Sequence, residues 1–131
     1  MKLLLDTHIW LWSVVEPQRL SQSVRDEIQD PLNELWLSPI SIWELIVLHQ
    51  KGRLLPEPNI EIWISEALQA LPLREASLTN EVAREIGRLQ FPNRDPADRF
   101  LIATAKVFEL TLVTADERLL TIQDVPILPN R

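Results

Sequence analysis

The chain has 131 residues, 46% of them hydrophobic and 24% charged, which fits one globular domain over residues 1–131. Cysteine is absent, and this excludes both a disulfide framework and a thiolate metal site. The net charge of −6 disfavours tight non-specific nucleic-acid binding, but it allows a metal-dependent nuclease whose acids hold cations. Because Asp6 interrupts the apolar N-terminus and no run approaches the ~20 apolar residues of a membrane span, we expect a cytoplasmic protein with no membrane partner.

Short apolar runs alternate along the chain with longer segments of helical period. We expect strands at residues 2–5, 35–38, 71–75, 111–114 and 125–128. We expect helices at residues 7–15, 21–30, 38 to near 52, 59–70, 78–89 and from 95 onwards, with a short helical turn after 114. This alternation is typical of βαβ units and predicts an α/β fold, a three-layer α/β/α sandwich with a central parallel sheet.

Four acidic residues stand alone in apolar surroundings. Asp6 ends the first strand in KLLLD, and Asp116 follows a later strand in TLVTAD. Glu44 is isolated within SPISIWELIVL, and Asp98 lies on the apolar face of its predicted helix. Sites in open parallel sheets form beyond the carboxyl ends of the strands, so we expect these two strand ends and two helix faces to converge on one rim.

Each acid also has a purely structural interpretation. Asp6 and Asp116 are suited to capping the helices that follow them. Asp98 would be the third residue of its helix, where a carboxylate interacts favourably with the helix dipole. A buried Glu, by contrast, is rare unless it is paired. A cluster of carboxylates is costly through desolvation and mutual repulsion, and hard cations such as Mg²⁺ or Mn²⁺ relieve that cost. The four acids together therefore favour a metal site.

With these four acids, the sequence resembles the PIN-domain nucleases, and more narrowly the VapC-type toxins of bacterial toxin–antitoxin pairs. The resemblance covers essentially the whole chain and rests on four segments: LLLDTHIWLW, SPISIWELIVLHQKGRL, RDPADRFLIATA and LTLVTADERL. It implies a PIN-like sandwich with a pocket that binds one or two Mg²⁺ or Mn²⁺ ions through Asp6, Glu44, Asp98 and Asp116. One departure is that relatives of this subgroup often carry His shortly before the DP pair, where this chain has PheProAsnArg at 91–94.

The resemblance implies an endoribonuclease that hydrolyses RNA phosphodiester bonds and acts as a toxin. A cation held by Asp6 and Asp98 would lower the pKa of a bound water, and a second cation would stabilise the leaving 3′ oxygen. Asp116 would complete the coordination. Glu44 would hold a water or accept a proton.

Other residues are expected to support this pocket or to contact its substrate. Thr7 and Thr114 share the turns of their neighbouring acids, and Asp95, directly before a proline, is predicted to cap its helix. Arg94 and Arg99 flank the acids and are candidate contacts for RNA phosphates, although Arg99 is equally suited to pairing with a neighbouring Asp.

The resemblance also implies a cognate antitoxin that blocks the acidic groove and a toxin homodimer, neither of which the sequence itself shows. His8 is expected to be a packed or capping residue. The five tryptophans are expected in the core, with a partner surface as the alternative for some of them.

Two other functions stay open. One is a catalytically inactive PIN-fold module that binds a protein, and the other is a DNA-directed nuclease of the same fold. Composition does not separate ribose from deoxyribose, so only the subgroup resemblance favours RNA. A receiver-like phosphoacceptor domain is disfavoured, because the first strand ends in DTH rather than in paired acids.

Overall fold

A computed structural model describes residues 1–52, 59–90 and 95–131. Its centre is a five-stranded sheet in the order β3-β2-β1-β4-β5, and every neighbouring pair is parallel. The strands are β1 (Lys2–Leu5), β2 (Glu34–Leu37), β3 (Leu73–Glu75), β4 (Thr111–Thr114) and β5 (Ile127–Pro129). The predicted parallel sheet is confirmed.

The described residues form helices between these strands. The α-helices are α1 (Thr7–Val15), α2 (Gln22–Gln29), α3 (Pro39–Gln50), α4 (Ile60–Ala70), α5 (Asn80–Glu85) and α6 (Pro96–Val107). Shorter 3₁₀ turns are η1 (Pro17–Arg19), η2 (Ile86–Arg88) and η3 (Glu117–Leu119). No helix in the described part of the chain is long and apolar enough to span a membrane.

Several predicted boundaries differ from the structure. The strands predicted at 35–38 and 71–75 lie at Glu34–Leu37 and Leu73–Glu75. The helix predicted at 78–89 begins after Thr79, whose hydroxyl accepts the Val82 N–H at 3.1 Å, and its last turn is the 3₁₀ turn η2. The strand predicted at 125–128 lies at Ile127–Pro129 instead. Pro126 has no N–H to donate to a ladder, and its carbonyl oxygen accepts the Leu112 N–H at 2.9 Å.

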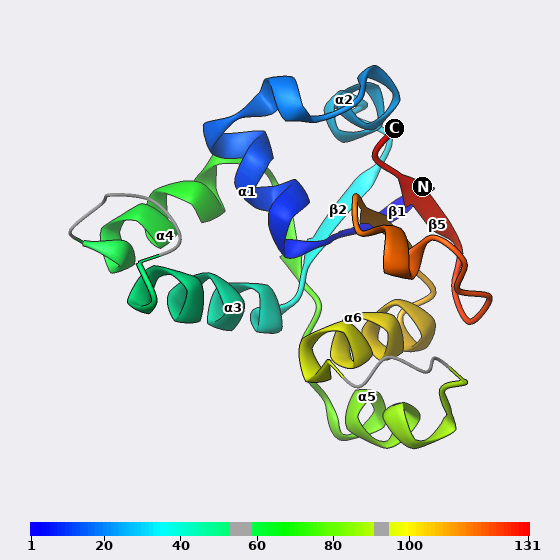
Figure 1. Ribbon diagram of the computed structural model, residues 1–131. Helices are drawn as coiled ribbons and strands as arrows, with labels where there is room; N and C mark the ends of the chain where they lie inside the picture. The colour runs from blue at the N-terminus through cyan, green and yellow to red at the C-terminus, as the bar shows by residue number, and fades with distance from the viewer. Residues whose placement is uncertain (53–58, 91–94) are drawn as a thin grey trace.

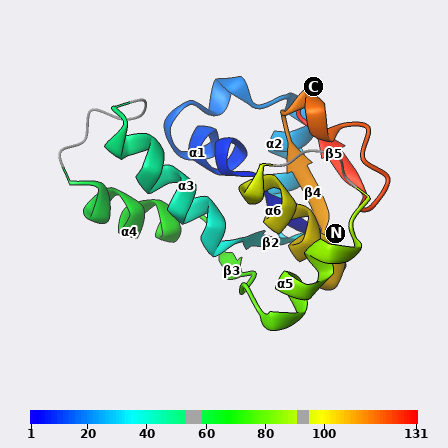
Figure 2. The same ribbon diagram turned by 60° about the horizontal axis from the view of Figure 1, so that its bottom comes forward.

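Different helices cover the two faces of the sheet (Figure 1). On β1, Leu3 and Leu5 pack into one core with Trp10 of α1, whereas Leu4 packs into a second core with Leu101 of α6. All five side chains are fully buried. Because side chains alternate across a strand, β1 supplies both cores, and the three-layer α/β/α sandwich follows. The helices α3 and α4 lie side by side as a pair (Figure 2).

The order of the strands fixes where a site can form. The chain first adds β2 and β3 on one side of β1 and then returns through α6 to place β4 on the other side. Leu5 of β1 is paired with Val113 of β4, so the carboxyl ends of these strands lie next to each other. Such a switch point leaves a crevice above the sheet, where α/β folds bind ligands.

Candidate active site

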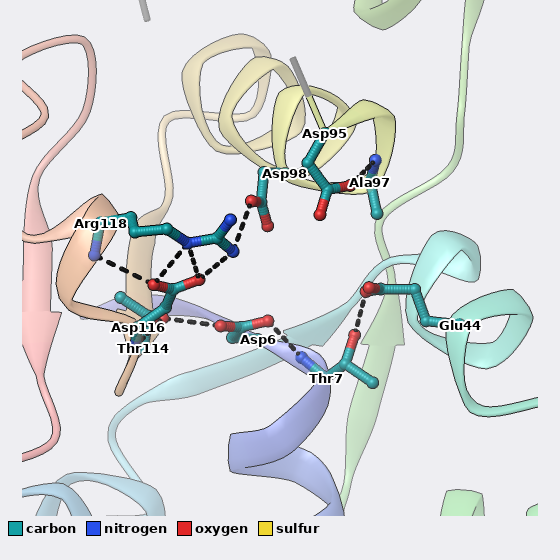
Figure 3. A network of polar contacts seen from close by, with 9 residues as sticks. All are labelled: Asp6, Thr7, Glu44, Asp95, Ala97, Asp98, Thr114, Asp116 and Arg118. Atoms are coloured by element: carbon teal, nitrogen blue, oxygen red, sulfur yellow. Dashed lines mark hydrogen bonds and ion pairs between the residues drawn. The ribbon is translucent and has the colours of Figure 1, made fainter. Parts of the chain in front are cut away.

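A cavity of about 520 Å³ lies at the carboxyl ends of β1 and β4. Its lining includes all four predicted acids: Asp6, Glu44, Asp98 and Asp116. They come from the β1–α1 turn, helix α3, the first turn of α6 and the β4–η3 turn (Figure 3). The structure thus brings residues more than a hundred positions apart into one cavity, while their role as metal ligands stays a prediction.

The Asp6 carboxylate is held from two sides. The Thr7 N–H donates to Oδ1 at 2.7 Å, and the Thr114 hydroxyl donates to Oδ2 at 2.6 Å. The Thr114 hydroxyl also accepts the Asp116 N–H at 3.0 Å, so it ties the two strand-end acids together. Burial raises the pKa of Asp6 despite the two hydrogen bonds, because little water remains to solvate the charge.

Glu44 is half-buried and is joined to the opposite side of the β1–α1 turn. The Thr7 hydroxyl lies 2.6 Å from Glu44 Oε1, to which it donates, and 2.9 Å from the Ser41 hydroxyl. Burial raises the pKa of Glu44, and the charges of Asp6 and Asp95 add to that effect, while the Thr7 hydrogen bond opposes it. Thr7 therefore connects α1 to α3 and orients both acids, as a supporting residue should.

Asp98 lies in the first turn of α6 and is only 7% exposed. Burial and the nearby charge of Asp95 raise its pKa to about 7, although Arg118 acts in the opposite direction. Asp95 itself caps the helix as predicted, since its Oδ1 accepts the Ala97 N–H at 3.0 Å. A cation close to the Asp98 carboxyl group, at the start of the buried face of α6, would therefore favour its ionised form.

Arg118 lies among these acids, although sequence reasoning gave it no role. Its Nη2 donates to Asp116 Oδ2 at 2.6 Å and to Asp98 Oδ2 at 3.2 Å (Figure 3). Its Nε lies 3.1 and 3.2 Å from the two Asp116 oxygens. The guanidinium holds the pKa of Asp116 below its usual range. The signal in the sequence was the spacing Asp-Glu-Arg, which places the cation two residues after the acid.

Three acids at the cavity have the capping role that the structural interpretation gives them. Asp6, Asp95 and Asp116 each accept a backbone N–H at the start of α1, α6 or η3. One carboxylate has two oxygens with several lone pairs, so a cap and a second contact are compatible. Capping alone does not explain why three helix starts meet in one cavity.

The donor set is suited to a hard divalent cation, since carboxylate oxygens are the ligands that Mg²⁺ and Mn²⁺ prefer. The raised pKa values of Asp6, Glu44 and Asp98 show that positive charge would favour their ionised forms. Within residues 1–52, 59–90 and 95–131, however, no three Asp, Glu or His side chains are arranged so that they could hold a metal ion as they stand. A cation bound here would therefore require some rearrangement of these side chains.

The predicted RNA contacts do not both reach this cavity. Arg99 Nη2 donates to the Ile86 carbonyl oxygen at 3.1 Å, which directs its guanidinium to the η2 segment. Arg99 is not among the residues that line the cavity. Arg94, with the rest of PheProAsnArg at 91–94, lies outside the described residues.

Three residues expected in packed positions, His8, Trp12 and Trp43, line the cavity. His8 is exposed at the start of α1, where its ring centroid lies 5.7 Å from that of Trp12. Trp43 is 53% exposed, so the expectation of a core position is wrong for this residue. It is confirmed for Trp10, which is fully buried. The neighbours of Glu44 on α3 thus form an aromatic and apolar wall beside the acids.

Comparison with known proteins connects this geometry to one family. The chain matches the PIN domain model over residues 3–125. It is 36% identical over 118 residues to Ribonuclease VapC22 of Mycobacterium tuberculosis, covering 88% of each protein. Its fold is similar to VapBC2 from Rickettsia felis bound to a promoter DNA fragment, with a TM-score of 0.74, 19% identity and 98% of each chain covered. A toxin–antitoxin complex from Klebsiella pneumoniae gives a TM-score of 0.65 at 18% identity, over 98% of this chain and 97% of that one.

Proposed function

Because this chain belongs to the PIN-domain family, we propose that it is a Mg²⁺- or Mn²⁺-dependent endoribonuclease and the toxin of a VapC-type toxin–antitoxin pair. The observation that carries the proposal is the meeting of Asp6, Glu44, Asp98 and Asp116 in one cavity at the switch point of the sheet. RNA is favoured over DNA as the substrate because the 36% identical relative is named a ribonuclease.

In this proposal the side chains of the cavity have three different roles: metal binding, orientation of a ligand and proton transfer. Asp6, Asp98 and Asp116 would hold one or two divalent ions, which supply Lewis-acid activation of water and neutralise charge on the leaving oxygen. Thr7 and Thr114 keep Asp6 oriented, since each donates a hydrogen bond to a different carboxylate oxygen. Glu44, held by the Thr7 hydroxyl and with a raised pKa, is placed to accept a proton.

The proposal includes protein partners. One structurally similar protein is a toxin–antitoxin complex, and this supports a cognate antitoxin for the present chain. A toxin homodimer belongs to the same expectation. Co-expression with the protein encoded beside it, followed by size-exclusion chromatography with light scattering, would measure both the complex and the state of the toxin alone.

A metal titration combined with a cleavage assay tests the catalytic part. Mn²⁺ is titrated by calorimetry into wild type, Asp98→Asn and Asp26→Asn, and each protein is incubated with single-stranded RNA and DNA of one sequence. Asp26 is the matched control, because it is an exposed aspartate on α2 that does not line the cavity. We expect Asp98→Asn to weaken Mn²⁺ binding and cleavage at least tenfold, in the range of about 10–100-fold for groups that support a metal site, whereas Asp26→Asn matches wild type.

The other outcomes separate the alternatives. Preferential cleavage of the DNA strand would identify a DNA-directed nuclease of the same fold. A wild type that binds no Mn²⁺ at millimolar concentration and cleaves neither strand would contradict the enzyme and leave a protein-binding PIN module. RNA cleavage that survives both EDTA and Asp98→Asn would contradict the assigned pocket.

A further inference from the structure

The contacts of Arg118 differ from those of an ordinary surface ion pair. Its guanidinium bonds two carboxylates that belong to different elements, Asp116 at the end of β4 and Asp98 in α6. Both of these acids are proposed ligands of a divalent cation. The guanidinium thus supplies positive charge where the proposed cation would supply it, and it spans two of the carboxylates that the cation would need.

Divalent binding and the present position of Arg118 compete for the same oxygens. Asp98 Oδ2 and Asp116 Oδ2 both accept from Arg118 Nη2, at 3.2 and 2.6 Å. When an oxygen coordinates a small divalent cation at the roughly 2.0–2.1 Å typical of Mg²⁺, its hydrogen bond from a second cation is weakened, because the two positive charges repel.

Arg118 is able to leave this position at small cost. Its side chain is 60% exposed, whereas the side chain of Asp98 is 9% exposed, so the arginine is the partner that can move into solvent. It extends from the short η3 turn, at the mouth of the same cavity. Because the arginine side chain is exposed, water can solvate the guanidinium when a divalent cation takes its place beside the two carboxylates.

A released Arg118 would lie beside the acids at the place where a nucleic-acid phosphate must approach. The planar guanidinium fork binds phosphate oxygens with two parallel hydrogen bonds, as it binds carboxylates. The local negative charge of the acids repels RNA, and a freed guanidinium offsets that repulsion. The same side chain therefore suits both anions at different stages.

From these contacts we propose that Arg118 alternates between two anionic partners. It joins Asp98 to Asp116 until a divalent cation takes their oxygens, and it then binds a phosphate of the RNA substrate. This inference rests on the proposed function, because both the cation and the RNA belong to it. It assigns to Arg118 a phosphate-binding role that depends on prior metal binding.

The matched control for this residue is Arg74. The side chains of Arg118 and Arg74 are 60% and 61% exposed. Arg74 lies on β3, and its Nη1 is 3.7 Å from Glu34 Oε1, whereas Arg118 contacts acids of the cavity. Substitution by Gln removes one positive charge from either site. Arg118→Lys keeps the charge but loses the two-pronged geometry.

Two measurements on the full chain test the exchange. Calorimetric titration with Mn²⁺ should show roughly two- to fivefold tighter binding to Arg118→Gln than to wild type, the range expected when one ion pair of an exposed arginine no longer competes. Fluorescence anisotropy with labelled single-stranded RNA, in the cold and with strand integrity checked on a gel, should show weaker binding of Arg118→Gln only when Mn²⁺ is present. In EDTA the two proteins should bind RNA alike. With Mn²⁺ present, the RNA affinity of Arg118→Lys should lie between those of wild type and Arg118→Gln. Arg74→Gln should match wild type in its affinity for Mn²⁺.

The outcomes distinguish this inference from the function on which it rests. Equal or weaker Mn²⁺ binding by Arg118→Gln, with RNA still cleaved, would overturn the exchange while the nuclease stands. A loss of RNA affinity that is the same in Mn²⁺ and in EDTA would also overturn it, because it would indicate a permanent surface contact. Absence of Mn²⁺ binding in all of these proteins would overturn the proposed function, and the exchange would fall with it.

Discussion

Two acidic side chains on neighbouring helices are almost equally buried and lie in opposite electrostatic surroundings. Glu85 of α5 is 8% exposed, and Asp98 of α6 is 7% exposed. Glu85 accepts from Arg88 at 2.9 Å and pairs with Lys106 of α6 at 3.1 Å, and these cations lower its pKa. Burial and the charge of Asp95 raise the pKa of Asp98 to about 7, and the contact with Arg118 does not reverse this.

In Glu85 the negative charge is balanced by neighbouring cations, whereas in Asp98 the ionised form still destabilises the folded protein. At Glu85 the protein supplies the positive charge itself, and the result is a link between two helices. At Asp98 the neighbouring groups that dominate are other acids, so the folded protein gains from an added cation. Burial alone does not identify a candidate functional carboxylate, whereas burial together with nearby like charge does.

The largest expected effect follows from replacing each acid by its neutral amide. In EDTA at about pH 8, Asp98→Asn should raise the free energy of unfolding by roughly 1–3 kcal/mol, because it removes a buried charge near other acids. Glu85→Gln should lower it, because two cations lose their partner. Thermal and urea unfolding of both variants and of wild type measure whether each substitution raises or lowers the free energy of unfolding. Two changes of the same sign would refute the distinction between these acids.

A smaller effect is expected at the hydroxyl that holds the pocket together. Thr114→Val keeps the size of the side chain but removes the donor to Asp6 and the acceptor for the Asp116 N–H. Loss of this hydroxyl should lower the free energy of unfolding by about 1 kcal/mol, the net contribution of a typical intramolecular hydrogen bond. Thr111→Val, at the other end of β4, is the matched control and should change stability less. If the two substitutions cost the same, the hydroxyl does not organise the acids.

The sequence predicted the fold and the four acids of the cavity because both depend on patterns that extend over several residues. Alternation of apolar runs with helical segments identified β1, α1 and α6, with caps at Asp6 and Asp95. Isolation in apolar surroundings singled out Glu44 and Asp98. Boundaries failed where a local feature competes with the pattern, as at the Thr79 cap and around Pro126.

The cations and rings around the acids could not be predicted in the same way. Arg118 and His8 are exposed, so no hydropathy pattern marks them, and their positions depend on which elements the fold brings together. Arg99 was chosen for its place beside Asp98 in the sequence, but its side chain reaches toward Ile86 instead. Adjacent positions on a helix point in different directions, so closeness in sequence gives little information about direction.

The pH dependence of stability separates the same two acids, because their contributions change in different pH ranges. Asp98 has a folded pKa of about 7 against an ordinary value of 3.8, so the folded state binds the extra proton between these values. Stability in EDTA should therefore rise as the pH falls from about 7 toward 4, with a slope from this group of at most about 1.4 kcal/mol per pH unit. Glu85 has a lowered pKa, so its contribution is present above its ordinary value of 4.5 and is lost at more acidic pH.

Urea midpoints across this pH range, for wild type, Asp98→Asn and Glu85→Gln, resolve the two windows. Asp98→Asn should reduce the slope of the profile between pH values of about 4 and 7, since Asn does not titrate there, and the raised pKa values of Asp6 and Glu44 account for the slope that stays. Glu85→Gln should leave that region unchanged and reduce the loss of stability below about pH 4.5. Saturating Mn²⁺ should abolish or reverse the rise in wild type, because a bound cation favours the ionised form of Asp98. A wild-type profile that is flat in EDTA would show that the charge of Asp98 is already compensated, and the contrast with Glu85 would then disappear.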